Sequence, residues 1–411
     1  MQRSHICDTS ADSAKGQLAT QSVAGVLVYR MRKRGSVRKP KSTVNSKAGA
    51  LALNTVCPYF TMFPLAFPLA RLARARPDEW VLDPFCGRGT TLFAARMRGL
   101  NCVGVDSNPV AAAIAAAKLT DADPDGIVAL AHGVLRGGKD PRDVPQGPFW
   151  GMCFHPVTLR EICLLREHFL KSCETEEEVA LRALVLGILH GPKLKTIATY
   201  LSNQMPRTYA TKPEAAIRFW KKQGLTHPPV VDVLGAVALR ARHAFATRPK
   251  TVVGEVYLGD ARHIHRQIPS HRQFTWVITS PPYFGMRTYG PDQWLRNWFL
   301  GGPPCVDYSQ VGQLAHHAEK FVDELATVWR SVARRCVDGA CLVVRFGYLP
   351  SIPIDPREVL SASLARADSG WRIRRWVDAG SSSNGKRQSE QFGQCSNDAA
   401  REMDAYARLE A

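Results

Sequence analysis

The sequence contains no apolar run long enough to cross a membrane. Its longest uninterrupted apolar stretch, Ala183–Leu189, is far shorter than the roughly 18 residues that a transmembrane helix needs. The first residues show no basic segment followed by an apolar one, which a secretory signal requires. These absences predict a cytoplasmic protein with no membrane partner.

Cysteine is also sparse, with 11 in 411 residues, and no two cysteines have the C-x-x-C spacing. This usage excludes a disulfide scaffold and suits no zinc site, so we expect buried, reduced thiols and no metal. Hydrophobic residues make up 45% of the chain and charged residues 22%. Both values are ordinary for globular proteins and exclude a fibrous or wholly disordered class.

Acidic residues are too few to balance the basic ones. The chain has 54 Lys and Arg against 36 Asp and Glu, a net charge of +18 that favours an anionic partner. Residues 1–50 alone hold ten basic and two acidic residues, interleaved with Gly, Ser and Thr. Such a composition buries little apolar surface, so it predicts a basic disordered arm over residues 1–50.

From residue 51 the pattern alternates between short apolar strands and helical periods. A strand beginning at Trp80, a helix over Thr91–Arg98, a strand over Asn101–Asp106 and a helix over Val110–Leu119 form one βαβα unit. Residues 125–250 show only helical periods. Strands are predicted again over Val252–Asp260, Phe274–Thr279, Ala340–Phe346 and Trp371–Val377. The order predicts a mostly parallel α/β sheet with a helical insert over 125–250 and a polar tail over 381–411.

The first motif, Asp83-Pro-Phe-Cys-Gly-Arg-Gly-Thr90, lies between a strand and a helix, and Asp106 ends the next strand. Glycines let a ligand approach backbone N–H groups, and an acid at that second strand end can accept both hydroxyls of a ribose. A dinucleotide fingerprint needs a third glycine where Thr91 stands, and a P-loop needs a lysine after Gly89. A cofactor with a ribose but no pyrophosphate fits better, and S-adenosyl-L-methionine is the common one.

The second motif is Ser280-Pro-Pro-Tyr283, directly after a predicted strand. Two prolines fix their φ angles and donate no N–H, so the carbonyls between them are held out as acceptors. Ser280 and the Pro281 carbonyl can accept the hydrogens of an exocyclic amine, and Tyr283 offers a flat face for its ring. The alternative is a plain turn at the end of a strand.

Together the two motifs resemble those of the DNA amino-methyltransferases, which methylate cytosine N4 or adenine N6. The first is similar to the family's Asp-Pro-Phe-x-Gly-x-Gly-Thr cofactor motif, and the second to its catalytic motif in the cytosine-N4 form. The resemblance covers about residues 55–120 and 250–380. It implies an α/β, Rossmann-like S-adenosyl-L-methionine-dependent methyltransferase sheet, with a cofactor-binding half over 51–124 and a catalytic half over 251–380.

The resemblance also implies roles for single residues. Asp106 would hold the ribose and Asp260 the adenine amine, and Tyr59–Pro68 resembles the family's N-terminal cofactor segment. The expected cofactor-binding residues are Asp83, Pro84, Phe85, Gly87, Gly89, Thr90, Asp106 and Asp260, and the expected catalytic residues are Ser280, Pro281, Pro282 and Tyr283.

The insert is the candidate DNA-recognition region. Residues 192–250 hold eleven basic and two acidic residues, interleaved with Tyr200, Tyr209, Phe219 and Trp220, as a DNA face requires. The insert precedes the Asp260 strand, whereas recognition in the family usually follows it, so a structural helical cap stays open. The resemblance implies a site-specific cytosine-N4 methyltransferase acting on DNA, with a possible partner restriction endonuclease.

Three alternatives remain: methylation of adenine N6, methylation of an RNA amine, and a non-catalytic nucleic-acid-binding protein that kept the fold. A competing motif is Gly301-Gly-Pro-Pro-Cys305, which matches the nucleophile motif of the cytosine-C5 methyltransferases. That cysteine should follow a buried strand, but the preceding residues 293–300 predict an amphipathic helix. We therefore expect Cys305 to be a loop thiol.

Overall fold

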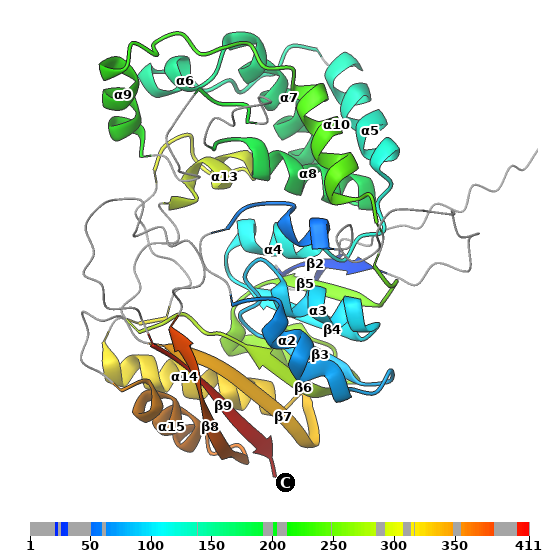
Figure 1. Cartoon of the computed structure of the whole chain (residues 1–411), viewed down its shortest axis with the longest axis vertical. Helices are drawn as coiled ribbons and strands as arrows, with labels where there is room; N and C mark the ends of the chain where they lie inside the picture. Colours follow the sequence, from blue (N-terminus) through cyan, green and yellow to red (C-terminus); the bar gives the residue numbers. More distant parts are fainter. Residues whose placement is uncertain are drawn as a thin grey trace, which may run out of the picture.

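A computed structural model describes most of the chain. The described residues are 21–23, 26–31, 51–59, 63–137, 139–191, 200–203, 212–247, 249–284, 292–306, 314–315, 317–347, 355–381 and 401–410. Among them, nine strands form one sheet in the order β1-β2-β5-β4-β3-β6-β7-β9-β8. The sheet lies beneath a layer of helices, as Figure 1 shows.

Five central strands are parallel, so their carboxyl ends meet at one edge of the sheet. They are β3 (Trp80–Asp83), β4 (Asn101–Asp106), β5 (Gly254–Leu258), β6 (Phe274–Thr279) and β7 (Cys336–Gly347). The strand β9 (Arg401–Leu409) runs antiparallel between β7 and β8 (Trp371–Ser381). The order reverses at β3, and ligands of such sheets bind outside the carboxyl ends at this switch point. This is the Rossmann-like methyltransferase sheet that the sequence predicts.

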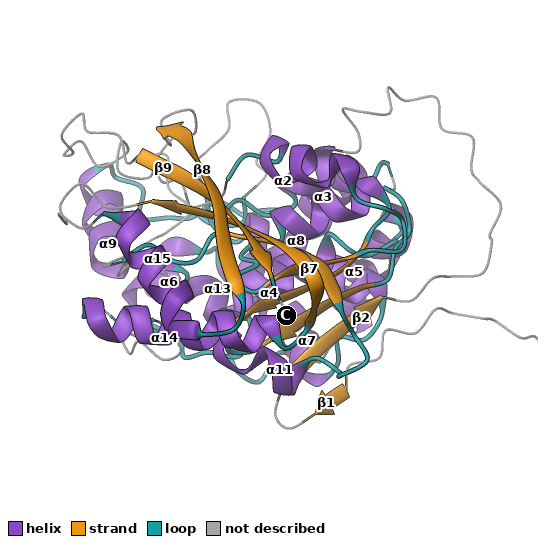
Figure 2. Cartoon of the chain, turned by 90° about the horizontal axis from the view of Figure 1, so that it is seen from below, coloured by secondary structure: helices purple, strands orange, loops and turns teal. Residues whose placement is uncertain are grey.

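Side chains alternate between the two faces of the sheet, and helices cover both faces, so the sheet has a core on each side. Val81 and Ile278 point into a core with helices α2 (Ala66–Arg71), α3 (Thr90–Arg98) and α4 (Pro109–Ala117). Leu82 and Val277 point into a second core with α11 (Ile264–Gln267), α14 (Ala318–Ala333) and α15 (Pro356–Ala367). Helices accordingly flank β7, β8 and β9 on both sides in Figure 2.

The predicted insert contains helices and connecting loops, and no strand, among its described residues. Its helices are α5 (Pro124–Gly137), α6 (Pro148–Cys153), α7 (Pro156–Lys171), α8 (Glu176–Ile188), α9 (Pro213–Lys222) and α10 (Val233–Ala244). The predicted helix around Trp294 is α13 (Trp294–Phe299), and it lies in the same layer (Figure 1). The ring of Trp294 packs edge to face on Trp150 of α6 at 5.8 Å between centroids. The helical layer is therefore fixed to the catalytic half through buried aromatic contacts.

The expected polar tail over residues 381–411 is wrong for its last part, because β9 fills the gap between β7 and β8. Met403, Ala405 and Ala407 are buried, while acidic side chains alternate with them on the other face. The acidic positions make the segment look polar in sequence. The pairing of β9 with two neighbours satisfies its backbone on both sides, and Arg345 and Arg71 pair with the buried carboxylate of Asp404.

The expected disordered arm over residues 1–50 also differs from the structure at two short segments. β1 (Gln21–Val23) and β2 (Val26–Met31) form a hairpin, and β2 pairs antiparallel with β5. Tyr29 is buried, and the Arg182 guanidinium lies 4.9 Å from the centre of its ring. Residues 32–50, which carry most of the arm's charge, lie outside the described residues.

None of the described helices is long and apolar enough to span a membrane.

Candidate active site

The glycine turn between β3 and α3 requires left-handed backbone at two positions. Gly87 has φ of +49° and Gly89 has φ of +75°, a region that residues with a Cβ rarely adopt. A Cβ on Gly89 would lie 2.9 Å from the Cα of Ala115, so this glycine also lets α3 pack closely on α4. A Cβ on Gly87 would meet nothing within 4 Å. Gly87 therefore leaves an open approach to the backbone, as ligand binding requires.

Asp106 lies where the sequence predicts it, at the end of β4 beside the glycine turn. Its Oδ2 accepts a hydrogen bond of 2.8 Å from the Gly87 N–H, and its Oδ1 accepts one of 2.8 Å from the Asn108 N–H. Burial raises the pKa of the Asp106 carboxyl to about 6, although both bonds oppose the shift. The Asn108 side chain in turn donates to the Tyr59 hydroxyl at 3.2 Å. This contact brings the start of the Tyr59–Pro68 segment to the same site.

Asp83 joins the two sequence motifs. Its Oδ1 accepts a bond of 2.6 Å from the hydroxyl of Thr279, the residue before Ser280, and one of 3.2 Å from the Phe85 N–H. The Asp83 side chain is only 1% exposed, and burial raises the pKa of its carboxyl to about 6. In the structure Asp83 therefore holds the end of β3 against the end of β6. Direct contact with a cofactor stays a prediction for it.

The catalytic motif follows β6 at the carboxyl edge of the sheet. Ser280 and Tyr283 are partly exposed and Pro281 is buried. The Tyr283 hydroxyl donates a hydrogen bond of 2.6 Å to Oε1 of Glu402, and its ring packs edge to face on Phe346, with 5.8 Å between centroids. The sequence gives no sign of the Glu402 contact, because β9 is not recognisable as a strand.

A buried ion pair lies beside Tyr283. Arg345 Nε donates to Asp404 Oδ1 at 2.8 Å and its Nη2 to Oδ2 at 3.0 Å, so the pair is bidentate. The Arg345 guanidinium also stacks 3.9 Å from the ring centre of Phe67, which belongs to α2. Although burial alone lowers the pKa of Arg345, its bonds to Asp404 raise it overall. The sequence pattern marks neither Asp404 nor Glu402.

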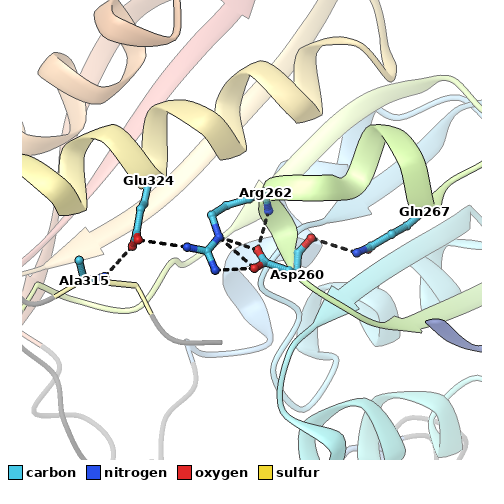
Figure 3. Close-up of polar contacts among 5 residues, drawn as sticks. All are labelled: Asp260, Arg262, Gln267, Ala315 and Glu324. Atoms are coloured by element: carbon cyan, nitrogen blue, oxygen red, sulfur yellow. Dashed lines mark hydrogen bonds and ion pairs between the residues drawn. The ribbon is translucent and has the colours of Figure 1, made fainter. Parts of the chain in front are cut away.

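Asp260 lies just beyond the end of β5, as predicted, and its carboxylate is bound by Arg262. Arg262 Nε donates to Oδ1 at 3.0 Å and to Oδ2 at 2.9 Å, and its Nη1 pairs with Glu324 of α14 at 3.1 Å. Figure 3 shows Arg262 between the two acids, and Glu324 also accepts the Ala315 N–H at 2.6 Å. Burial alone raises the pKa of Asp260, but its bonds to Arg262 hold it below its ordinary value.

The site offers features that fit S-adenosyl-L-methionine. Besides the open approach at Gly87, the Thr90 hydroxyl is buried and has no hydrogen-bond partner within the part of the chain that the structure describes. A buried polar group without a partner is costly, and a bound ligand can satisfy it. The carboxylates of Asp106 and Asp260 lie at the ends of neighbouring strands, where a nucleoside can bridge them.

Cys305 is exposed in the loop after α13, and the Trp150 indole donates to the adjacent Pro304 carbonyl at 3.3 Å. The expected loop thiol is confirmed, because no strand positions this cysteine at the sheet edge. The described His, Cys, Asp and Glu side chains form no cluster that could hold a metal.

The aromatic residues of the expected DNA face lie differently from the prediction. Trp220 is fully buried and Tyr200 is 8% exposed, so both belong to the core of the helical layer. Phe219 is partly buried against that core, and Tyr209 lies outside the described residues. The exposed charged residues of α9 are Arg218, Lys221 and Lys222, together with Glu214, which pairs with Arg218 at 3.7 Å. Charge, rather than base stacking, is what this surface presents.

A family model described as DNA methylase matches residues 37–117. The match spans the glycine turn, Asp106 and the segment containing Tyr59, and so covers most of the cofactor-binding half. Over these residues the chain is similar to a DNA methylase. No protein with curated annotation matches the sequence.

Solved structures show a likeness at low identity. The rRNA methyltransferase aviRa from Streptomyces viridochromogenes is 13% identical, over 89% of this chain and 94% of that chain, with a TM-score of 0.34. An rRNA methylase from Streptococcus thermophilus is 7% identical, over 86% and 100%, with a TM-score of 0.30. A SAM-dependent methyltransferase from Methanosarcina mazei is 10% identical, over 85% and 98%, with a TM-score of 0.31.

The strand order, rather than these superpositions, defines the fold. Together with the family match, it supports a methyltransferase that uses S-adenosyl-L-methionine, as the sequence predicts.

Proposed function

We propose that the protein transfers a methyl group from S-adenosyl-L-methionine to the exocyclic N4 amine of cytosine in DNA. The observation that carries the proposal is the 2.6 Å bond from Thr279 to Asp83, because it places Ser280-Pro-Pro-Tyr283 beside the glycine turn. A methyl donor held at one motif can then face an amine held at the other. The serine in the first motif position favours cytosine over adenine.

In this proposal the chain acts mainly by positioning and electrostatics. S-adenosyl-L-methionine, when bound, supplies an electrophilic methyl group. Ser280 and the Pro281 carbonyl accept the amine hydrogens and leave the nitrogen lone pair free to attack. Pro282 fixes the backbone of the turn, and Tyr283 stacks on the base, which leaves the duplex because its amine is otherwise enclosed.

The cofactor is assigned to the other predicted residues. Asp106 would hold the ribose hydroxyls and Asp260 the adenine amine, while Gly87 and Thr90 would face the methionyl part. Pro84 and Phe85 would shape the wall, with Asp83 and Gly89 keeping the turn in place through the contacts described above.

The helical insert over residues 125–250 is the proposed DNA-recognition region. Lys221 and Lys222 end α9 and are exposed, and Arg218 on the same helix has a side chain that is 74% exposed. Such cations can neutralise phosphates, which dominate the affinity of proteins for DNA. A partner restriction endonuclease belongs to this proposal, since site-specific DNA methylation often protects against one.

Mass spectrometry of the methylated product tests the proposal. Purified protein is incubated with unmethylated bacterial genomic DNA and S-adenosyl-L-methionine, and the DNA is then digested to nucleosides. We expect N4-methylcytosine. N6-methyladenine would keep the mechanism and change the base. In a parallel incubation with bacterial RNA, methylation of RNA alone would replace DNA as the substrate. Cofactor binding without any methylated product would favour a non-catalytic nucleic-acid-binding protein.

A further inference from the structure

The strand β9 begins at the edge of the sheet where the catalytic motif lies. Because β9 runs antiparallel, its first residues pair with the last residues of β7, and Glu402 lies opposite Gly347. One strand further, Thr279 at the end of β6 pairs with Val344 of β7. The C-terminal segment of the chain therefore delivers an acidic side chain to the level of Ser280-Pro-Pro-Tyr283.

Tyr283 lies across the carboxyl end of β7 and is held at two points. Its ring edge contacts Phe346, which is 1% exposed, and its hydroxyl reaches Glu402 Oε1 at 2.6 Å. That distance is typical of a hydroxyl donating to a carboxylate, among the stronger hydrogen bonds in proteins. A ring fixed at its edge and at its hydroxyl has little freedom to turn about its long axis or swing away.

Glu402 is itself held firmly. Its backbone pairs with Gly347 on one side and with Gly380 of β8 on the other, so the two residues directly opposite it carry no side chain. Its Oε2 lies 4.0 Å from Arg345 Nη1, and Arg345 is locked by the bidentate bond to Asp404. The hydrogen bond from Tyr283 to Glu402 therefore connects the tyrosine to a buried ion pair rather than to a mobile surface group.

We propose that Glu402 is a positioning residue that orients Tyr283 to receive the extruded base. This inference rests on the proposed methylation of a nucleic-acid base. Stacking requires the ring plane to lie parallel to the base, and the proline turn fixes only the backbone. The hydrogen bond to Glu402 and the contact with Phe346 together fix the ring before the base arrives, which lowers the conformational entropy lost on capture.

Methyl-transfer kinetics with the full chain test this role. The substrates are unmethylated bacterial genomic DNA and S-adenosyl-L-methionine labelled on its methyl group. Glu402→Ala and Tyr283→Phe should each lower kcat/KM for DNA by about tenfold. The double variant should lose no more than either single variant, because both changes remove the same hydrogen bond. Glu402→Gln keeps an acceptor oxygen and should recover most of the activity. Cofactor affinity, measured by calorimetry, should stay unchanged in all four.

The matched control is Glu410→Ala, which removes the same residue type just beyond the far end of β9. Glu410 is exposed and pairs with Arg374, so its variant should keep wild-type kinetics. An active wild type with an equally active Glu402→Ala or Tyr283→Phe variant would overturn the orientation role alone. A wild type that methylates neither DNA nor RNA would overturn the proposed function and this role together.

Urea unfolding of the same variants reads the contact independently of activity. Tyr283→Phe and Glu402→Ala should have non-additive effects on the unfolding midpoint, since the first change already breaks the bond. Strictly additive effects would show that the hydrogen bond between Tyr283 and Glu402 does not exist in solution and would overturn the inference. Non-additive unfolding combined with additive losses of kcat/KM would make the contact purely structural and would also overturn it.

Discussion

The carboxylate of Asp83 accepts a hydrogen bond of 2.6 Å from the hydroxyl of Thr279, and this bond joins two motifs 196 residues apart in sequence. It connects neighbouring parallel strands at the point where both end, so the residues after each strand start from fixed positions. A buried carboxylate at this joint is costly when ionised, because burial disfavours its charge. The joint therefore gives the fold a specific dependence on pH.

Asp83→Asn should remove that dependence. Burial raises the pKa of Asp83 from 3.8 to about 6, so the folded state favours the protonated acid more than the unfolded state does. Its contribution to stability is present below pH 4 and is lost as the pH rises through about 6. The loss, relative to the asparagine variant, amounts to about 3 kcal/mol in the free energy of unfolding.

Urea unfolding of both proteins between pH 4 and pH 7 measures the difference. The control is Asp78→Asn, whose side chain is 77% exposed. Its curve should run parallel to that of the wild type. A parallel curve for Asp83→Asn as well would show that Asp83 is not the buried acid that the structure places there.

Arg262→Ala should weaken the binding of S-adenosyl-L-methionine about three- to tenfold if Asp260 holds the adenine amine. Arg262 fixes the carboxylate through its backbone N–H and both edges of its guanidinium, and Glu324 fixes Arg262 in turn. Without it, Asp260 must be ordered by the ligand. Arg262→Lys should be intermediate, because lysine keeps the charge but lacks the planar fork.

Calorimetric titration with S-adenosyl-L-methionine checks this expectation. Arg366→Ala is the control, since Arg366 also bridges two acids of α14, Glu319 and Asp323, but on the exposed side of the helix. Tighter binding by Arg262→Ala would mean that Arg262 competes with the cofactor for Asp260.

The sequence predicts the parallel strands because each contains a short apolar run. β3, β4 and β5 end at or near an Asp, and β6 ends in a proline turn. Asp83, Asp106 and Asp260 all lie at or just beyond such ends. It does not predict β9, because the charged residues Glu402, Asp404 and Arg408 interrupt its apolar positions, two of which are alanines. The contact between Tyr283 and Glu402 spans 119 residues and depends on the register of that strand, which no local pattern encodes.

The double charge reversal Lys221→Glu with Lys222→Glu should weaken DNA binding and make the remaining affinity less dependent on salt. Each phosphate contact that is lost reduces the slope of log K against log salt by about 0.9. Arg266→Glu with Arg334→Glu is the control, because both residues are exposed at the edge of the sheet opposite the catalytic motif. Binding of labelled duplex DNA, measured by anisotropy over a range of salt, gives both slopes. Equal losses in the two double variants would mean that net charge alone, not the α9 surface, governs binding.

Ser280→Ala should lower kcat by about 10- to 100-fold and change the affinity for S-adenosyl-L-methionine by less than about twofold. Ser280 follows the strand end that Asp83 fixes, and in the proposed mechanism its oxygen acts only on the amine being methylated. Single-turnover methyl transfer and calorimetry separate the two effects. Equal losses of turnover and cofactor affinity would assign Ser280 to the cofactor site instead. Cys305→Ala, in the exposed loop after α13, should keep full activity, whereas an inactive Cys305→Ala would indicate attack by a thiolate on the base and replace direct transfer to the amine.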